Sequence, residues 1–162
     1  MASARVSPGA KMSDEWLTPP EIVKALGPFD LDPCAPLNRP WDTASKHYTI
    51  NDDGLRRPWE GRVWLNPPYS SVSTWVARLA AHGNGIALIF ARVETAWFQR
   101  EVFGRASGIL FLAGRPIFHH GDGRKAKWNG GAPSVLVAYG SENENALILS
   151  GLSGKFIDLV CA

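Results

Sequence analysis

The sequence is poor in cysteine and has no long apolar run. Only Cys34 and Cys161 occur among its 162 residues, so a disulfide framework is excluded and a reducing, cytoplasmic setting is the simplest interpretation. There is no Cys-x-x-Cys pair and no cluster of histidine and cysteine, and we therefore expect no metal site. The longest apolar stretches, GIALIFA and SGILFLAG, are too short to cross a bilayer, and we expect no membrane partner.

What is present is the composition of an ordinary globular domain with a weak basic bias. Hydrophobic residues make up 45% and charged residues 20% of the chain, and the formal net charge of +2 fits a polyanionic partner. Residues 1–13 resemble a flexible tail more than a secretory signal, and we expect residues 14–162 to form a single domain. The seven tryptophans lie in part in connecting segments, where an indole can anchor a loop or stack on a base.

Segments typical of helices and of strands alternate along the chain. Residues 18–27 predict a helix that Thr18 caps and Gly27 ends, and the segments 71–83 and 94–106 predict amphipathic helices. Apolar runs predict strands at 28–32, 62–65, 85–91, 108–114, 134–140 and 155–160, with a helical turn at 143–150. This alternation predicts an α/β domain with a compact, mostly parallel sheet flanked by helices and with a late antiparallel strand. Residues 33–61 show little periodicity, and a loop of that length is usually functional.

The tetrapeptide Asn66-Pro67-Pro68-Tyr69 directly follows one of these strands. Ligands bind beyond the carboxyl ends of strands in such sheets, and Asp32 falls at the same edge. The Asn66 amide oxygen and the Pro67 carbonyl can accept hydrogen bonds from the two N–H groups of an amine conjugated to a ring. Pro67 and Pro68 restrict the backbone and so fix the direction of that carbonyl, while Tyr69 offers a ring for stacking. The pattern predicts activation of a planar amine as a nucleophile; the alternative is a rigid turn at a strand end.

Several segments, in order, resemble one enzyme family. The tetrapeptide resembles the catalytic motif of S-adenosylmethionine-dependent amino-methyltransferases. EWLTPPEIVKAL, FDLDPCA and DDGL are similar to segments of phage-type, Dam-related DNA N6-adenine methyltransferases that lie around the methyl donor. The resemblance runs from about residue 14 to residue 139 and implies a Rossmann-like methyltransferase fold with S-adenosylmethionine as cofactor. It implies Asn66, Pro67, Pro68 and Tyr69 as catalytic residues, and Trp16, Thr18, Asp32, Pro33, Cys34, Ala35, Asp53 and Asn66 as cofactor-binding residues.

The sequence departs from this family pattern in two ways. No glycine-rich turn follows Asp32, although a donor without phosphates needs one less than a dinucleotide does. Between Asp32 and Asp53 there is no room for a complete βαβ repeat, so the strand that usually carries the ribose ligand is missing or much shortened. Asp53 is the expected acceptor for the donor's ribose or adenine, with Asp52 a turn residue, but the two assignments could be exchanged. Asp32 as a loop cap and Thr18 as a helix cap remain alternatives.

Basic side chains predict contacts with nucleic acid. Residues 119–131 form a glycine-rich basic loop, and arginines lie close to the tetrapeptide and after residue 91. His119 and His120 have no further ligand at metal spacing, so we expect a solvated loop pair. The predicted contacts are Arg56, Arg57, Arg92, Arg124, Lys125, Lys127 and Trp128, with Arg62 as a further member of the group near the tetrapeptide.

The leading hypothesis is a DNA adenine-N6 methyltransferase that acts on a flipped base, in the cytoplasm of the host if a phage encodes it. Cytosine N4, RNA adenine and protein glutamine N5 need related chemistry and stay open, as does a silent DNA-binding protein of a mobile element. Only the 33–61 and 119–131 segments are candidates for reading bases, and their cations suit phosphates. We therefore expect relaxed site specificity and no separate target-recognition domain. A homodimer is left open.

Overall fold

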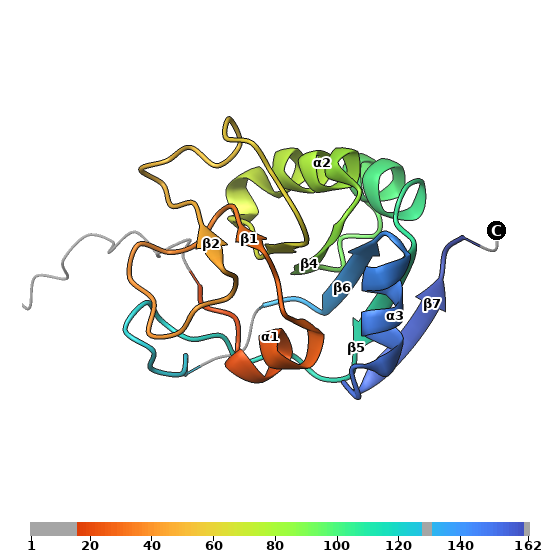
Figure 1. Cartoon of the computed structure of the whole chain (residues 1–162). Coiled ribbons are helices and arrows are strands. Elements are labelled where there is room, and N and C mark those ends of the chain that lie inside the picture. The colour runs from red at the N-terminus through yellow and green to blue at the C-terminus, as the bar shows by residue number, and fades with distance from the viewer. Residues whose placement is uncertain (1–15, 128–130, 161–162) are drawn as a thin grey trace, which may run out of the picture.

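The computed structural model describes residues 16–127 and 131–160, so the expected tail at residues 1–13 lies outside it. Its centre is a seven-stranded sheet with the order β2-β1-β3-β4-β6-β5-β7 (Figure 1). The strands are β1 (Leu31–Asp32), β2 (Lys46–His47), β3 (Val63–Leu65), β4 (Gly85–Phe90), β5 (Gly108–Leu112), β6 (Ser134–Tyr139) and β7 (Gly154–Asp158).

Strands β1 to β5 run in one direction and β6 and β7 in the other. β1 pairs in parallel with β2 and β3, and β3 pairs in parallel with β4. β6 lies antiparallel between β4 and β5, and β7 pairs antiparallel with the outer side of β5. The predicted mixed α/β domain is confirmed, and the sheet has two late antiparallel strands where the sequence analysis expected one.

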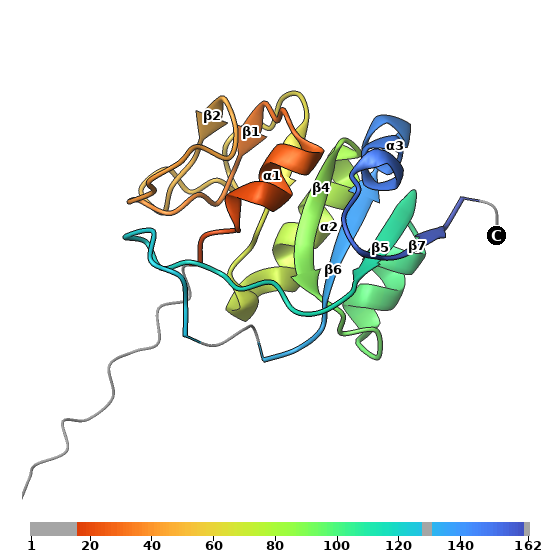
Figure 2. The ribbon, with the colours of Figure 1, turned by 90° about the horizontal axis from the view of Figure 1, so that it is seen from below.

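Helices cover both faces of the sheet (Figure 2). α2 (Val72–His82) and the π-helical segment η2 (Phe98–Phe103) pack on one face, and α1 (Pro20–Leu26) and α3 (Ser141–Leu149) pack on the other. Alternate residues of β4 supply both layers, because Ala87 and Ile89 join the first apolar cluster while Ile86 and Leu88 join the second. A short 3-10 turn, η1 (Tyr69–Ser71), connects the tetrapeptide to α2. No helix of the described residues is long and apolar enough to cross a membrane.

Three local expectations differ from the structure. The residue at the start of α1 is Pro19 and no side chain caps it, so the predicted Thr18 cap is wrong. The helix expected over 94–106 is reduced to η2, whose wider π-helical turns lie between Trp97 and Gly104. The 33–61 segment contains the two-residue strand β2, which periodicity could not reveal because one alternation of side chains leaves no pattern. This strand fits the expectation that the strand after Asp32 is missing or much shortened.

Arg62 does not belong with the cations near the tetrapeptide. It precedes β3, at the opposite end of that strand from Asn66, and only 7% of it is exposed. Its Nε donates to Asn143 Oδ1 at 2.6 Å and its Nη1 to the Pro28 carbonyl at 2.9 Å, while its guanidinium lies over the Phe29 ring. Arg62 therefore joins the sheet to α3, and its expected proximity to nucleic acid is wrong.

Candidate functional site

A pocket of about 550 Å³ lies at the edge of the sheet where β1 and β3 end. That volume is in the usual range for small-molecule sites, roughly 300–1,000 Å³. The chain segments after the two strands form its walls, together with the segment before α1 and the start of α2. The pocket is lined by Trp16, Pro33, Cys34, Ala35, Pro36, Thr49, Ile50, Asp53, Gly54, Asn66, Pro68, Ser70, Ser71 and Trp75.

The pocket brings together most, but not all, of the residues predicted to bind a cofactor. Trp16, Pro33, Cys34, Ala35, Asp53 and Asn66 line it, whereas Asp32 and Thr18 do not. Thr18 is buried, and its hydroxyl has no hydrogen-bond partner among the described residues. The lining residues that the sequence analysis missed come from the 33–61 loop, from the turn into α2 and, for Trp75, from α2 itself. Their position in the sequence could have identified them, since these segments flank motifs already assigned to the site.

Asn66 has a defined orientation in the pocket wall. Its Nδ2 donates to the backbone carbonyl of Trp16 at 2.8 Å, so its Oδ1 points away from that carbonyl as an acceptor. The Cys34 thiol donates to the Asn66 backbone carbonyl with a 3.4 Å Sγ–O distance. The segments before α1, after β1 and after β3 therefore meet at this one residue.

Tyr69 stacks on Phe90, the last residue of β4. The ring centroids are 4.1 Å apart and the planes differ by 10°. The aromatic platform expected at Tyr69 thus consists of two rings from neighbouring strand ends. Sequence reasoning missed Phe90 because it is one apolar residue in the unbroken apolar run of β4, and nothing in that run distinguishes the residue that stacks on Tyr69. Its place at the carboxyl end of the strand next to β3 was the available signal.

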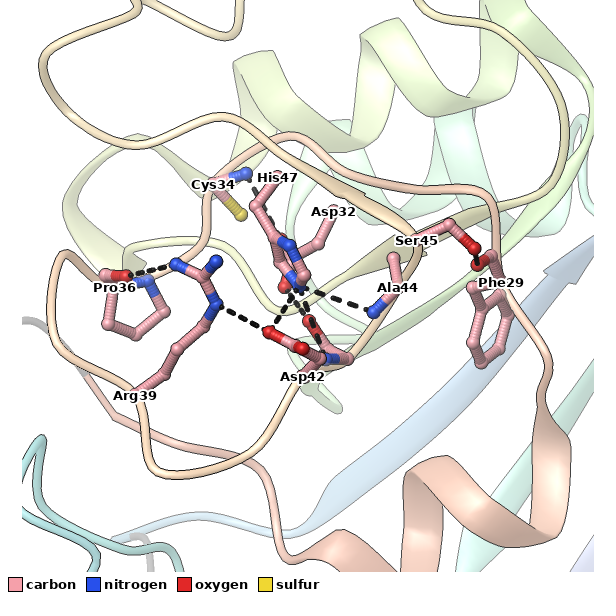
Figure 3. Close-up of polar contacts among 10 residues, drawn as sticks. Phe29, Asp32, Cys34, Pro36, Arg39, Asp42, Ala44, Ser45 and His47 are labelled. Carbon is pink, nitrogen blue, oxygen red and sulfur yellow. Dashed lines mark hydrogen bonds and ion pairs between the residues drawn. The ribbon is translucent and has the colours of Figure 1, made fainter.

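Asp32 does not line the pocket but contacts Cys34, which does, and so supports the wall (Figure 3). Its carboxylate accepts from the Cys34 N–H at 3.1 Å and from the Thr43 hydroxyl, and the residue is 3% exposed. Burial raises the pKa of Asp32 to about 6, with the two hydrogen bonds and Arg39 acting in the opposite direction. This is the loop-capping arrangement that the sequence analysis kept as an alternative, and direct contact with a cofactor stays a prediction.

A neutral histidine holds the segment that returns to β2. His47 Nε2 accepts from the backbone N–H groups of Thr43 and Ala44, both at 3.3 Å, so this nitrogen is unprotonated (Figure 3). Burial lowers the pKa of His47, in agreement with that role. The same turn carries Asp42, whose carboxylate pairs with Arg39 at 3.2 Å. His47 therefore holds the backbone of Thr43, and this fixes the position of the Thr43 hydroxyl that donates to Asp32.

The DDGL segment separates the roles of its two carboxylates. Asp52 accepts from the Thr49 N–H at 2.8 Å and from the Thr49 hydroxyl at 2.9 Å, which closes a turn as expected. Asp53 lines the pocket with a φ of +54° and pairs with Arg56 at 3.3 Å. Gly54 touches the opposite wall so closely that a Cβ there would overlap the Pro33 carbonyl oxygen. The later part of the 33–61 loop, at Gly54, is therefore packed directly on the start of the same loop, at Pro33.

Three of the predicted nucleic-acid contacts are exposed arginines that pair with acidic neighbours. Arg56 pairs with Asp53, Arg92 with Glu94 at 2.9 Å, and Arg124 with Asp122 at 2.7 Å. Arg57 Nε donates to the Asp52 carbonyl at 3.1 Å. Lys125 and Lys127 are exposed, and Trp128 lies outside the described residues.

The basic loop is in part a hairpin. The Ala126 N–H donates to the Phe118 carbonyl and the His120 N–H to the Arg124 carbonyl, with Gly123 in the turn at a φ of +86°. His119 is buried edge-on against the Trp41 ring, so its expected solvation is wrong, whereas His120 is exposed and lies against the Trp16 ring. A sequence pattern could not separate the two because only the fold decides which neighbour faces inward.

Of the four predicted catalytic residues, Asn66 and Pro68 line the pocket, whereas Pro67 and Tyr69 do not. An α/β sheet with the Asn-Pro-Pro-Tyr motif beside a pocket at its carboxyl edge is the arrangement expected of an amino-methyltransferase. A family model, DNA N-6-adenine-methyltransferase (Dam), matches residues 8–155, and the chain belongs to this family. It is also similar to the DNA N-6-adenine-methyltransferase of Escherichia phage T1, with 35% identity over 109 residues. That match covers 61% of this chain and 44% of the relative, so the chain spans less than half of the relative's length. No solved structure matches.

Among the described residues there is no group of three or more histidine, cysteine, aspartate or glutamate side chains placed to hold a metal ion. The expected absence of a metal therefore stays a prediction for the chain as a whole.

Proposed function

We propose that this protein is an S-adenosylmethionine-dependent DNA adenine-N6 methyltransferase. The observation that carries the proposal is the orientation of Asn66, whose amide donates to the Trp16 carbonyl and keeps its oxygen as an acceptor in the pocket wall. An acceptor at this position, beside the fixed Pro67 carbonyl, draws on both hydrogens of an exocyclic amine. The nitrogen lone pair then leaves conjugation with the ring and becomes nucleophilic.

The pocket residues fit the methyl donor by their chemistry. Asp53 offers a carboxylate to a ribose hydroxyl or an adenine amine, and Trp16, Ile50 and Trp75 offer apolar surface to a base. When bound, S-adenosylmethionine supplies an electrophilic methyl group. The chain's own residues hold the adenine that accepts the methyl group. Asn66 and Pro67 orient its amine, and the Tyr69–Phe90 platform provides a stacking surface for its ring. The amine proton passes to water after transfer.

DNA is the proposed partner, because the chain belongs to a family of DNA methyltransferases. An adenine amine inside a duplex cannot reach a pocket of this kind unless the base leaves the stack. The exposed cations Lys125 and Lys127 are the proposed phosphate contacts. The cations that pair with acids, Arg56, Arg92 and Arg124, contribute after exchanging a carboxylate for a phosphate.

We also infer a Rossmann-like methyltransferase fold, with residues 14–162 as one catalytic domain. The parallel strands β2-β1-β3-β4 support it, as does the antiparallel β6 inserted before β5. The position of the pocket beyond β1 and β3 fits the rule that ligands bind at the carboxyl edge of such sheets.

The deciding experiment is incubation of the protein with labelled S-adenosylmethionine and unmethylated DNA, followed by mass spectrometry of the nucleosides. We expect N6-methyladenine, and the N66A variant serves as the negative control. Label in N4-methylcytosine, in RNA or in a protein glutamine would replace the proposed substrate with one of those acceptors. No transfer to any of them, with no thermal stabilisation by the donor, would favour a silent DNA-binding protein.

A further inference from the structure

The carboxamide of Asn66 has a donor, Nδ2, and an acceptor, Oδ1, and a backbone carbonyl determines which way the amide is turned. The Trp16 carbonyl can only accept, and it receives Nδ2 at 2.8 Å. Rotating the amide by half a turn would place Oδ1 against this carbonyl, two acceptors in contact. The orientation that exposes the acceptor is therefore favoured before any substrate arrives.

The Trp16 carbonyl is itself held in place. The next residue, Leu17, is 2% exposed and exchanges two backbone hydrogen bonds with His119, both at 2.9 Å. His119 in turn bridges to Lys125 across the basic hairpin. On the other side, the Trp16 ring lies 5.2 Å from the His120 ring. The segment before α1 is thus fixed on the hairpin, and Asn66 is fixed on that segment.

We propose that Trp16 is a positioning residue, whose backbone carbonyl orients the Asn66 amide and makes the site require an amide rather than a carboxylate. This inference rests on the proposed function, since it concerns the group that accepts the substrate amine. A carboxylate at position 66 would accept N–H groups at least as well as an amide does. It would also bring a charged oxygen against the Trp16 carbonyl, so it would turn away or displace residues 16 and 17.

N66D tests the inference because its carboxyl can regain the missing hydrogen. In the protonated form, its hydroxyl donates to the Trp16 carbonyl and its other oxygen stays an acceptor, which reproduces the amide. The partial burial of residue 66 and the Asp53 carboxylate in the wall of the same pocket both favour the protonated form. Cys34, whose thiol donates to the backbone of residue 66, and the buried Asp32 behind it are the other titratable groups nearby. They are common to both proteins, so the ratio of N66D to wild-type turnover cancels their effects.

We expect the turnover ratio of N66D to wild type to rise at least tenfold between pH 8 and pH 5.5, with donor affinity within about threefold of wild type. Thermal melts at both pH values establish that N66D is folded. A ratio that stays constant across this range, whether near unity or near zero, in a folded variant would overturn the inference.

A second measurement does not depend on activity. In a nitrogen-correlated NMR spectrum, the Asn66 side-chain N–H₂ pair is assigned by its loss in N66D. We expect one of its protons to be shifted downfield and protected from exchange by the bond to Trp16. An unshifted, rapidly exchanging pair contradicts the orientation. If the wild-type protein methylates no substrate, the proposed function fails, and this signal still decides whether Trp16 holds the amide.

Discussion

At the scale of single residues, the site depends on polar groups whose partners fix them before a ligand binds. Asn66 is oriented by Trp16, and Asp32 is enclosed by Thr43 and Cys34. Among the described residues, only Asp53 presents a carboxylate to the pocket. Burial separates the two aspartates: Asp32 acts on the chain around it, and Asp53 is placed to act on a ligand.

Asp32 makes the stability of the fold depend on pH. Its pKa of about 6 lies above the ordinary value of 3.8, so its contribution to stability is complete below pH 3.8 and is lost as the pH rises through 6. The shift corresponds to about 3 kcal/mol. In urea titrations we expect D32N to gain stability relative to wild type as the pH rises from 4.5 to 7.5.

His47 acts in the opposite direction, because its lowered pKa stabilises the fold above pH 6.5 and that contribution is lost on acidification. Since His47 is present in both proteins, the difference between D32N and wild type isolates the aspartate. A difference that is constant with pH would show that Asp32 is ionised throughout this range.

Asp53 is predicted to bind the donor directly. We expect D53A to weaken S-adenosylmethionine binding about ten- to a hundredfold in calorimetric titration, because a charged hydrogen-bond partner is lost. R56A is the matched control, since it removes the other half of the ion pair and keeps the carboxylate. Equal losses in both variants would point to the loop conformation instead of the carboxylate.

At the scale of elements, two connections determine whether the site forms. The 33–61 loop folds back on itself where Gly54 meets Pro33. The segment before α1 packs on the 118–126 hairpin through Leu17 and His119. Neither is a regular helix or sheet contact. Both place site residues against backbone atoms of another segment.

Gly54 should be intolerant of any side chain. G54A introduces a methyl group that overlaps the Pro33 carbonyl, so the two pocket walls must separate. We expect a loss of about 1–3 kcal/mol in unfolding free energy together with weaker donor binding. G131A is the control, because a Cβ there meets nothing within 4 Å. Wild-type behaviour of G54A would contradict the close contact between the walls.

The hairpin should contribute to DNA affinity through charge. The triple variant R124A/K125A/K127A is expected to bind all sequences more weakly and to reduce the slope of log K against log salt by about 2. The reduction is less than three full contacts would give because Arg124 already pairs with Asp122. Fluorescence anisotropy over a salt series measures it, and D122A, which releases Arg124, should shift the slope the other way. A loss confined to one sequence would instead mean that the hairpin reads bases.

At the scale of the whole molecule, we predict phosphate contacts rather than base readers. The exposed arginines and lysines that we predict to contact DNA would position a duplex but carry little sequence information. We therefore expect methylation of adenines in many short contexts, with strong sensitivity to salt. Sequencing of methylated DNA tests this. Modification restricted to one motif of four or more fixed bases would contradict it and would indicate a further recognition surface, such as that of a homodimer.

The sequence by itself determined the mixed α/β class of the fold and predicted where the candidate site lies. Alternating apolar segments predict the strands at 62–65, 85–91 and 108–114, since hydrophobic periodicity is a local property that survives in one dimension. The Asn-Pro-Pro-Tyr motif predicts where the chemistry takes place, because its prolines restrict the backbone in any surrounding structure.

Only the tertiary structure decided which polar groups meet. Nothing local to Asn66 shows that Trp16, 50 residues earlier, supplies the carbonyl that orients it, or that Phe90 lies behind Tyr69. Arg62, His119 and Asp32 are ordinary polar residues in the sequence, but all three are buried in the structure. Their burial allows Arg62 to join the sheet to α3, His119 to hold the segment before α1, and Asp32 to support the pocket wall. Burial is a sum over distant segments, so a single stretch of sequence cannot specify it.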